Sequence, residues 1–339
     1  MHALNKILLG ATALALPFLS QAQAASLVTV TPPSGAVETI VFGINSHNVI
    51  TGSFFDANGV EHGFFGPLNG DYTTFDYGGT STGTEPRSIS DKGAINGFAA
   101  DPNFAVGTEF FRNADGTIET FTKDGAPLDG VAQGINKKGD STGDYIDPDS
   151  GVRTGYLGEN GKYKSDVDLG LNATRTSPRT INKSGALAGF FVDSGGVTHG
   201  FILDNGVVQV IDADGSGTTS LEGLNKKGLA TLQVTDADGN PHSMTYDSGS
   251  GEFTSIEVPD GSTFQQAWQV NDNGLIAVST DIASYIYCPK KAHCPNGAKD
   301  IGEGRSWHAK PGSAFVYDRN GRTGVKPARI VQPVRGAKQ

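Results

Sequence analysis

Six residues, one in each copy of a repeated segment, could together bind a ligand. Each stands three residues before the second member of an aliphatic-Asn or aliphatic-Ser pair that recurs along the chain. Guanidinium groups form charge-assisted hydrogen bonds with anions, and aromatic rings stack on apolar faces, so these types suit a polar or anionic ligand with an apolar face. The alternative interpretation is six unrelated, exposed loop residues. The candidates, called the ring residues below, are Phe42, Arg87, Gln133, Arg179, Glu222 and Trp268.

The second candidate region is an irregular stretch of the sixth repeat, at about residues 282–308. It adds about 25 residues between what we take to be the first two strands of that repeat. Long loops on regular scaffolds often carry function, so Trp307 and His308 within it are candidate specificity residues.

The same stretch holds both cysteines of the chain, Cys288 and Cys294. In an exported protein, two cysteines this close favour a local disulfide. A zinc site that adds His293 and His308 is the alternative. Because His293 is adjacent to Cys294, the two would bind one ion awkwardly, and the spacing matches no standard zinc finger, so we predict no metal site.

The sequence contains no recognisable set of catalytic residues, so the catalytic residues stay unknown. It favours a protein that is not an enzyme, and the enzyme alternative stays open. Histidines 62, 199 and 242 occupy equivalent repeat positions, which favours structural hydrogen bonds within each blade. The segment from Asp212 begins like a calcium loop, but its twelfth residue is Gly223, so a turn is favoured. Asp144 and Asn96 could point toward a channel, but one acid gives no acid/base pair. Motifs for Ser hydrolases, zinc proteases and phosphate binding are absent from the sequence, and we expect no cofactor.

The elements that must position these residues come from an internal repeat. The aliphatic-Asn/Ser pair, called the anchor, recurs with spacings of 45, 46, 46, 43 and 46 residues. Three residues after its second member stands Asn once and Gly five times, and these two types accept a left-handed backbone most readily. We therefore expect a tight turn at each anchor. The second members are Asn45, Ser90, Asn136, Asn182, Asn225 and Asn271.

Two further signals follow each anchor. An Asp ten or eleven residues later opens another turn, and a triplet of the type His62-Gly63-Phe64 then begins a second strand. In the sixth repeat we assign this triplet to Ser313-Ala314-Phe315. Between the turns lie short runs rich in β-branched and aromatic residues.

Three turn signals in about 46 residues predict four short antiparallel strands per repeat. Six such repeats predict an all-β, six-bladed β-propeller of four-stranded blades around a central channel, with a β-solenoid as the alternative. The segment 27–35 is comparable with the late-blade segment 254–261, so we expect the N-terminus to complete the sixth blade.

The anchor with its following Gly, the Asp turn and the His-Gly-Phe triplet together resemble the bacterial extracellular repeat group known as the HAF family. The resemblance covers residues 40 to about 321, with the second, fifth and sixth repeats departing from the triplet. It implies a secreted repeat protein and carries over no catalytic residue.

The ends and the composition indicate where the chain works. Residues 1–24 have a basic Lys6, an apolar run at 7–19 and small residues Ala22 and Ala24, which predicts a signal peptide cleaved after Ala24. The run is too short to cross a bilayer, so we expect a secreted or periplasmic protein without a transmembrane segment. The formal charge of −10 disfavours nucleic-acid binding.

The predicted organisation is therefore a signal peptide at 1–24, one propeller domain at 25–324 that includes the disulfide-stapled stretch, and a basic tail at 325–339. We expect a monomer. Two functions stay open: a binding or interaction module for a polar ligand, a glycan or an envelope protein, and an extracellular hydrolase or lyase that acts on a polysaccharide or other polar substrate at the channel mouth.

Overall fold

The structure is a computed structural model that describes residues 25–78, 83–100, 103, 105–213, 218–236, 238–263, 265–289 and 294–301, together with the backbone of 314–317. Over these ranges the chain forms β-strands joined by turns, without a helix. No helix long and apolar enough to cross a membrane occurs in the described ranges. The expected signal peptide at 1–24, the loop residues Trp307 and His308, and the tail at 325–339 lie outside them.

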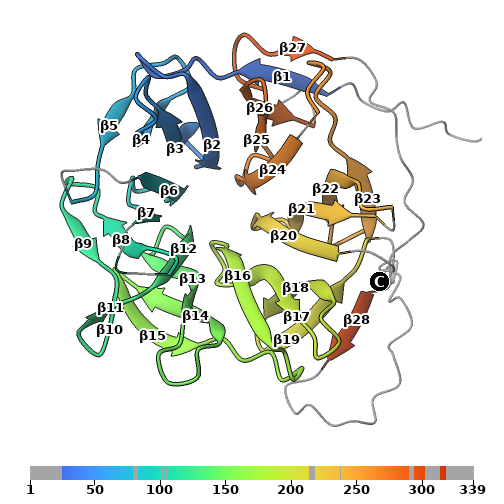
Figure 1. Ribbon diagram of the computed structural model, residues 1–339. Helices are drawn as coiled ribbons and strands as arrows, with labels where there is room; N and C mark the ends of the chain where they lie inside the picture. The colour runs from blue at the N-terminus through green and yellow to red at the C-terminus, as the bar shows by residue number, and fades with distance from the viewer. Residues whose placement is uncertain are drawn as a thin grey trace, which may run out of the picture.

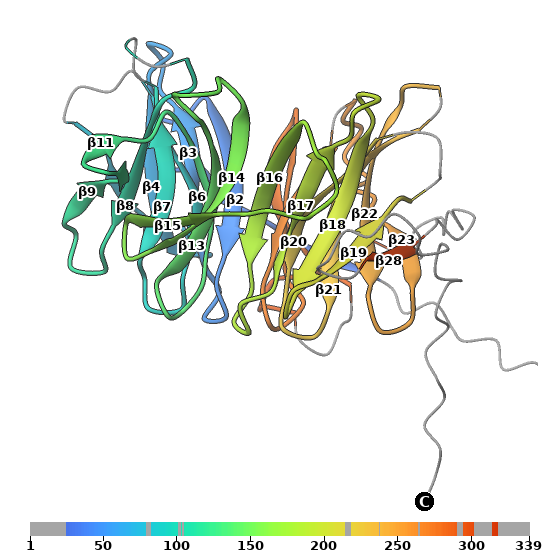
Figure 2. The same ribbon diagram turned by 90° about the horizontal axis from the view of Figure 1, so that it is seen from below.

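Six small sheets surround a central axis and form a six-bladed β-propeller (Figure 1). In the edge-on view the strands of each blade run across the thickness of the disc (Figure 2). Within each blade, sequential strands pair antiparallel and follow one another outward from the axis. The fold class predicted from the repeats is therefore confirmed.

The strand bounds show the regularity of the repeat. Blade 1 contains β2 (Glu38–Ile44), β3 (Val49–Phe55), β4 (Glu61–Pro67) and β5 (Thr73–Phe75). Blade 2 contains β6 (Thr84–Ile89), β7 (Ile95–Ala99), β8 (Thr108–Arg112) and β9 (Ile118–Thr120). Blade 3 contains β12 (Gly130–Ile135), β13 (Asp140–Ile146), β14 (Arg153–Glu159) and β15 (Lys162–Asp166), with β10 (Thr122–Lys123) and β11 (Ala126–Pro127) at its outer edge. Blade 4 contains β16 (Arg175–Ile181), β17 (Leu187–Val192), β18 (Thr198–Asp204) and β19 (Val207–Ile211). Blade 5 contains β20 (Thr218–Leu224), β21 (Leu229–Thr235), β22 (Pro241–Asp247) and β23 (Glu252–Ser255). Blade 6 contains β24 (Gln265–Val270), β25 (Ile276–Thr280) and β26 (Ser284–Cys288).

The N-terminal strand closes the propeller, as the sequence predicts. β1 (Ser26–Thr29) pairs antiparallel with β26, and β27 (Lys299–Asp300) pairs with its other side. The Ile301 amide also donates to the Ala25 carbonyl at 3.1 Å. Pairing β1 with β26 covers an edge of the sixth blade that would otherwise be open to another strand.

The last repeat differs from its sequence interpretation. A turn at 281–283 joins β25 directly to β26, so no insertion separates these strands. Ser284 lies opposite Ser279 as Gly63 lies opposite Ser53 in blade 1, so Ser284 and Tyr285 occupy the triplet position. The prediction assumed that the triplet aromatic follows the anchor residue by 19 or 20 residues, and the short turn at 281–283 makes this spacing smaller in the sixth repeat. The extra residues come after β26.

Of the triplet chosen for the sixth repeat, Ala314 and Phe315 lie on another blade, and Ser313 lies outside the described residues. β28 (Ala314–Tyr317) pairs antiparallel with β19 as a fifth strand of blade 4, beside its outer edge in Figure 1. In the other blades the triplets lie in the third strand and not the second, because the anchor turn itself joins the first two strands.

The anchor turns have the predicted backbone. The residue three after each anchor Asn or Ser has a positive φ, 61° at Asn48 and between 85° and 97° at the five glycines. The Asn side chain caps its own turn: in blade 5, Asn225 Oδ1 accepts from the amides of Lys227 at 2.9 Å and Leu229 at 3.1 Å.

These asparagines also link the blades, which the sequence pattern did not reveal. Each Asn Nδ2 donates to the backbone carbonyl of the next anchor residue around the axis, and we call this set the asparagine ring. The bonds run from Asn45 to Ser90 (3.1 Å), Asn136 to Asn182 (3.3 Å), Asn182 to Asn225 (3.3 Å), Asn225 to Asn271 (3.1 Å) and Asn271 to Asn45 (2.9 Å). Ser90 interrupts the asparagine ring: its short hydroxyl accepts from the Ala94 amide at 3.1 Å and donates to no carbonyl of the neighbouring blade among the described residues.

The core lies between the blades. The aromatic or Met residue of the triplet column is buried in every blade, and the column comprises Phe64, Phe110, Tyr156, Phe201, Met244 and Tyr285. The preceding small residue allows close approach of the next blade: a Cβ on Gly155 would lie 2.4 Å from Pro178 Cδ. Blade 2 has the buried Glu109 at this position, and Gly130 opposite makes room for its carboxylate. The columns that repeat therefore maintain the fold.

Candidate functional site

Every ring residue occupies a β-bulge in the innermost strand of its blade. The strand register skips one residue in five blades and two in blade 6. A bulged residue leaves the ladder and can direct its side chain away from the sheet. All six ring residues, with Gln269, line a single cavity between the innermost strands. The sequence-predicted column thus converges in space.

An aromatic cage surrounds one arginine of the ring. The guanidinium of Arg87 lies 4.5 Å from the ring centroid of Phe42 and 5.2 Å from that of Trp268. The two aromatic rings meet edge to face at 4.8 Å. Arg87 Nε also lies 2.8 Å from Glu85 Oε1. Burial lowers the pKa of Arg87, and the neighbouring Glu85 partly offsets this effect.

The other arginine has different neighbours. Arg179 Nε lies 3.8 Å from Glu222 Oε2, and its guanidinium lies 5.2 Å from the ring centroid of Phe190. Ser220 Oγ donates to Glu222 Oε1 at 2.6 Å. Both arginines of the ring are therefore paired with a glutamate, and the two sides differ in that Arg87 also lies between the aromatic rings of Phe42 and Trp268.

Gln269 is a site residue that sequence reasoning missed. Its Nε2 donates to the Gln133 carbonyl at 3.1 Å, and its Oε1 accepts from Ser88 Oγ at 2.9 Å. These two bonds run across the axis from blade 6 to blades 3 and 2. Gln269 reaches the axis because the bulge of blade 6 contains one residue more than the other bulges. The repeated sequence positions give no indication of this extra residue.

The ring leaves little free space. The cavity among its side chains measures about 10 Å³, enough for about one water molecule. Arg87 Nη1 and Trp268 Nε1 are buried there without a hydrogen-bond acceptor in the described chain. The side chains of Arg87 and Arg179 keep 14% and 20% of their surface exposed. The ring is thus a constriction with unused donors, and not a deep pocket.

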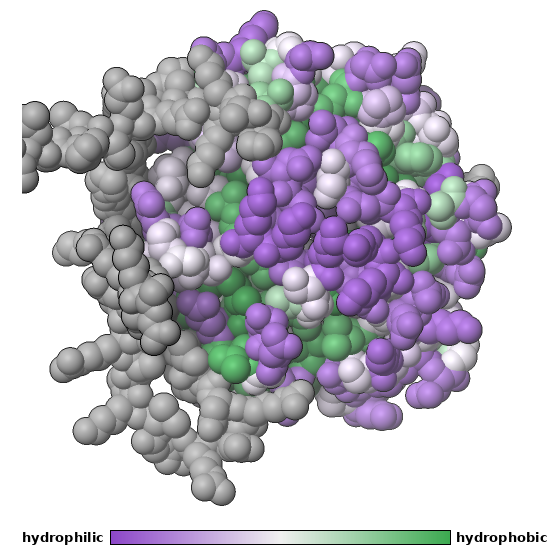
Figure 3. Space-filling model, turned by 180° about the vertical axis from the view of Figure 1, so that it is seen from behind, coloured by the Kyte–Doolittle hydropathy of each residue, from purple (hydrophilic) through white to green (hydrophobic). Residues whose placement is uncertain are grey.

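A larger cavity, of about 70 Å³, lies at the asparagine ring. Its lining includes Asp91, Lys137, Lys183 and Asp272, each the residue that follows an anchor Asn or Ser. Figure 3 looks onto the side opposite to Figure 1, toward which the innermost strands run in Figure 2, and shows hydrophilic side chains gathered over its centre. This channel mouth is therefore polar and charged.

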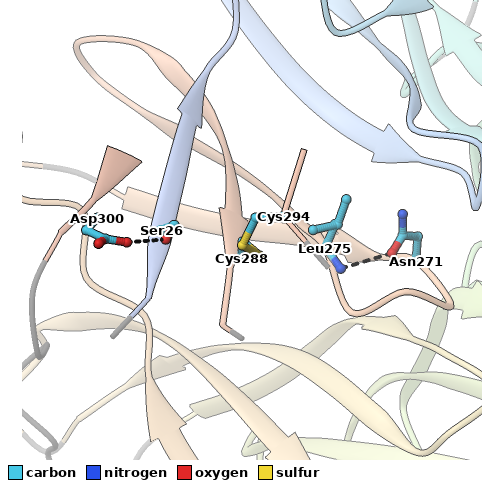
Figure 4. The surroundings of a disulfide bond; sticks show 6 residues. All are labelled: Ser26, Asn271, Leu275, Cys288, Cys294 and Asp300. Carbon is cyan, nitrogen blue, oxygen red and sulfur yellow. Dashed lines mark hydrogen bonds between the residues drawn. A yellow bond between two sulfur atoms is a disulfide. The ribbon is translucent and has the colours of Figure 1, made fainter. Parts of the chain in front are cut away.

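The cysteine pair forms the predicted disulfide. Cys288 ends β26 and is bonded to Cys294, with Cα atoms 5.7 Å apart (Figure 4). Ser26 pairs with Cys288 in the sheet, and its Oγ donates to Asp300 Oδ1 at 2.9 Å, so the disulfide lies beside the closing strands, as the same view shows. Among the described residues no group of three or more His, Cys, Asp or Glu side chains is placed to hold a metal ion, and His293 and His308 lie outside them.

The remaining polar candidates have structural partners. Nδ1 of His62 lies 2.9 Å from Asp76, Nδ1 of His199 lies 3.1 Å from Asp212, and Nε2 of His242 lies 2.8 Å from Asp236. Each contact stays within one blade, as expected for structural hydrogen bonds.

The two inner-strand candidates do not form a reactive pair. Asp144 is buried between Arg153 at 2.5 Å and Arg175 at 3.2 Å, and Asn96 Nδ2 donates to the Gly134 carbonyl at 2.9 Å. Their polar groups therefore stabilise contacts between neighbouring strands and blades.

One carboxyl group near the ring has a strongly shifted pKa. Burial raises the pKa of Glu61 to about 7, while a hydrogen bond from Ser53 at 2.6 Å opposes the shift. The negative charge of Glu85 raises the pKa of Glu61, and the positive charge of Arg87 lowers it. Glu61 therefore titrates near neutral pH.

Comparison with known proteins gives structural likenesses at low identity. No protein-family model and no curated protein sequence matches this chain. A catalytically inactive variant of virginiamycin B lyase from Staphylococcus aureus, with quinupristin, is 12% identical over 78% of this chain and 99% of its own, with a TM-score of 0.42. TolB from Acinetobacter baumannii is 15% identical over 66% and 63%, with a TM-score of 0.42. A mutant of the Aleuria aurantia lectin, in complex with a fucosyl-GlcNAc ligand, is 13% identical over 78% and 100%, also with a TM-score of 0.42.

Proposed function

We propose that this chain is a binding module that recognises a polar or anionic ligand at the ring residues. The carrying observation is that one column, different in every repeat, converges on a single constriction. Buried and unused donors at Arg87 and Trp268 stand beside the aromatic faces of the cage. An unpaired buried donor costs free energy, and a bound acceptor would remove that cost.

The size of the constriction limits how the ligand binds. A cavity of about 10 Å³ cannot enclose a sugar or an organic acid. A ligand must therefore lie across the ring with no more than one oxygen inside the cavity, where that oxygen accepts from Arg87 Nη1 or Trp268 Nε1. Enclosed small-molecule sites commonly measure ~300 to 1,000 Å³, so the geometry fits surface recognition better than an enclosed reaction chamber.

The proposed place of action is the cell envelope or the outside of the cell. The disulfide is compatible with an oxidising compartment. The leader-like residues 1–24 and the resemblance of the recurring residues to the HAF family support export after cleavage at Ala24. Mass measurement of the chain recovered from culture medium and periplasm tests both points: a mature mass that includes residues 1–24 would contradict them.

The binding proposal is tested by thermal shift of the disulfide-intact chain against oligosaccharides, peptidoglycan fragments and organic acids. Only a ligand that prefers the folded state can raise Tm. The triple substitution Arg87→Ala, Arg179→Ala and Trp268→Ala should abolish the shift produced by any active compound. The matched control changes exposed charges elsewhere, Lys162→Ala and Lys164→Ala. Retained binding by a folded triple variant would overturn the proposal.

A hydrolase or lyase is the second candidate, and Glu61 is the observation that favours it. A carboxyl group with a pKa of about 7 can exchange protons at neutral pH, and the charges of Glu61 and Arg87 of the ring interact electrostatically. The candidate is tested by assaying polysaccharide breakdown by the wild type and Glu61→Gln. Turnover that disappears in this variant would support an enzyme, and turnover unaffected by it would exclude this role for Glu61.

A further inference from the structure

The residue after each anchor Asn or Ser forms a second variable column, at the channel mouth. This mouth column comprises Ser46, Asp91, Lys137, Lys183, Lys226 and Asp272. It is separate from the ring residues, which lie three positions before the anchor residue in each repeat. Three consecutive blades, 3 to 5, therefore place lysine where blades 2 and 6 place aspartate.

The two aspartates of this column show what the position does. Asp91 Oδ1 accepts from the backbone amide of Ser46 in the preceding blade at 2.8 Å. Asp272 Oδ1 accepts from the amide of Lys226 in the preceding blade at 3.1 Å, and its other oxygen lies 3.3 Å from Lys226 Nζ. In both cases a carboxylate binds the amide that begins the neighbouring anchor turn.

Blades 3 and 4 present the same amides without a carboxylate. Within the described residues, the amides of Lys137 and Lys183 donate to no backbone or side-chain acceptor. At the position that holds Asp in blades 2 and 6, the blade after the Lys137 amide has Lys183 and the blade after the Lys183 amide has Lys226. An ammonium group cannot accept a hydrogen bond. The acceptor supplied internally at blades 2 and 6 is therefore missing here.

The lysine pair adds positive charge at the same place. Lys137 and Lys183 both line the 70 Å³ cavity, and neither lies within ion-pair distance of a described carboxylate. Repulsion from Lys183 is the largest cause that lowers the pKa of Lys137, Lys138 adds to it, and Asp91 opposes it. Two close ammonium groups with unused amides form an arrangement that a bound anion would stabilise.

We propose that the channel mouth between blades 3 and 4 binds an oxyanion, either a phosphate or a carboxylate group. Its oxygens take the place that the Asp91 and Asp272 carboxylates occupy in the other blades. The Lys137 amide donates to one oxygen, while the ammonium groups of Lys137 and Lys183 contact the anion from either side. This site is independent of the proposed function at the ring residues.

The first test compares phosphate and malonate with chloride at equal ionic strength, by thermal shift and calorimetry of the full chain. A specific site raises Tm with the oxyanion beyond the effect of chloride. Preference for phosphate or for malonate identifies which oxyanion the site takes. The double substitution Lys137→Gln and Lys183→Gln should weaken binding at least about tenfold, since each lost charge-assisted bond costs roughly a factor of ten. The control with the same change of charge is Lys162→Gln with Lys164→Gln on β15, which should bind like the wild type.

The second test supplies the missing carboxylate internally. Lys183→Asp should give the Lys137 amide the partner that Ser46 and Lys226 already have, raise Tm without added oxyanion, and abolish the response to it. Backbone NMR of the wild type should show the amide protons of Lys137 and Lys183 shifting as phosphate or malonate is added. Equal shifts with chloride, unchanged affinity in the lysine double variant, or a full response in Lys183→Asp would each overturn the proposal.

Discussion

Completing the asparagine ring at blade 2 should stabilise the propeller. Among the described residues, the Asn136 carbonyl accepts only from the Gly139 amide of its own turn, whereas the Asn182 carbonyl accepts from both its turn amide and Asn136 Nδ2. Ser90→Asn supplies the missing donor at a position where five other blades already hold asparagine. One net intramolecular hydrogen bond contributes about 1 kcal/mol. For a chain of this size that corresponds to a rise of about 1 to 2 °C in Tm.

The reverse substitution tests the same bond from the opposite side. Asn225→Ser keeps a short acceptor for the turn amides, as Ser90 does, but loses the 3.1 Å bond from Nδ2 to the Asn271 carbonyl. It should cost about 1 kcal/mol, and Asn225→Ala, which also loses two amide bonds, about 2 to 3 kcal/mol. Urea unfolding of the disulfide-intact chain measures these differences.

The control removes an asparagine outside the ring. Asn69 is exposed, and within the described residues its side chain donates only to Asp71, at 2.9 Å, so Asn69→Ser should change stability by no more than about 0.5 kcal/mol. If Ser90→Asn were no more stable than the wild type and Asn225→Ser were as neutral as this control, the bonds between blades would contribute nothing net and the reasoning would be refuted.

Three further outcomes follow from the structure. Glu61, whose folded pKa of about 7 exceeds its ordinary value of 4.5, holds extra protons in the folded state, so the free energy of unfolding should fall as pH rises from about 4.5 to 7; Glu61→Gln should flatten this fall in urea titrations, and an unchanged slope would contradict the assignment. Replacing Cys288 and Cys294 by Ala should cost about 2 kcal/mol, because the bridge closes a short loop, and equal urea midpoints for variant and wild type would contradict this. Gly155→Ala should cost about 1 to 3 kcal/mol, since its Cβ would overlap Pro178, and a wild-type Tm would show that the blades can separate at no cost.

The features that could be predicted from sequence are those that local chemistry repeats six times. A left-handed turn needs Gly or Asn, so the anchor column revealed the turns, and Asn48 and Gly93 have the expected positive φ. The ring column was found because its position is constant while its residue type varies. Its bulges were not predicted, since Phe42 or Gln133 carries no local signal for an unpaired strand residue.

What sequence could not provide depends on contacts between distant segments. The asparagine ring uses backbone carbonyls one blade away, and the turn-capping role of Asn already explained the residue type. Gln269 entered the site through an irregular bulge. The partner of 314–317 could not be inferred, because a short strand of small and aromatic residues fits the edge of any blade. The role of the lysines in the mouth column could not be predicted from sequence, because it becomes visible only from the backbone amides that Asp91 and Asp272 bind at the equivalent positions.

The closing strand sets an order for the folding of the whole chain. β1 is the first described strand to leave the site of synthesis, yet Leu27 pairs with Tyr287, 260 residues later. Closing so large a loop is entropically costly and slow, so the other blades can form while β1 still lacks its partner. During that interval both β1 and the edge of β26 are open to the same elements of a second copy. The strand that closes the propeller, β1, is therefore also the segment that two folding chains would exchange to form domain-swapped dimers. A high concentration of folding chains would favour that exchange.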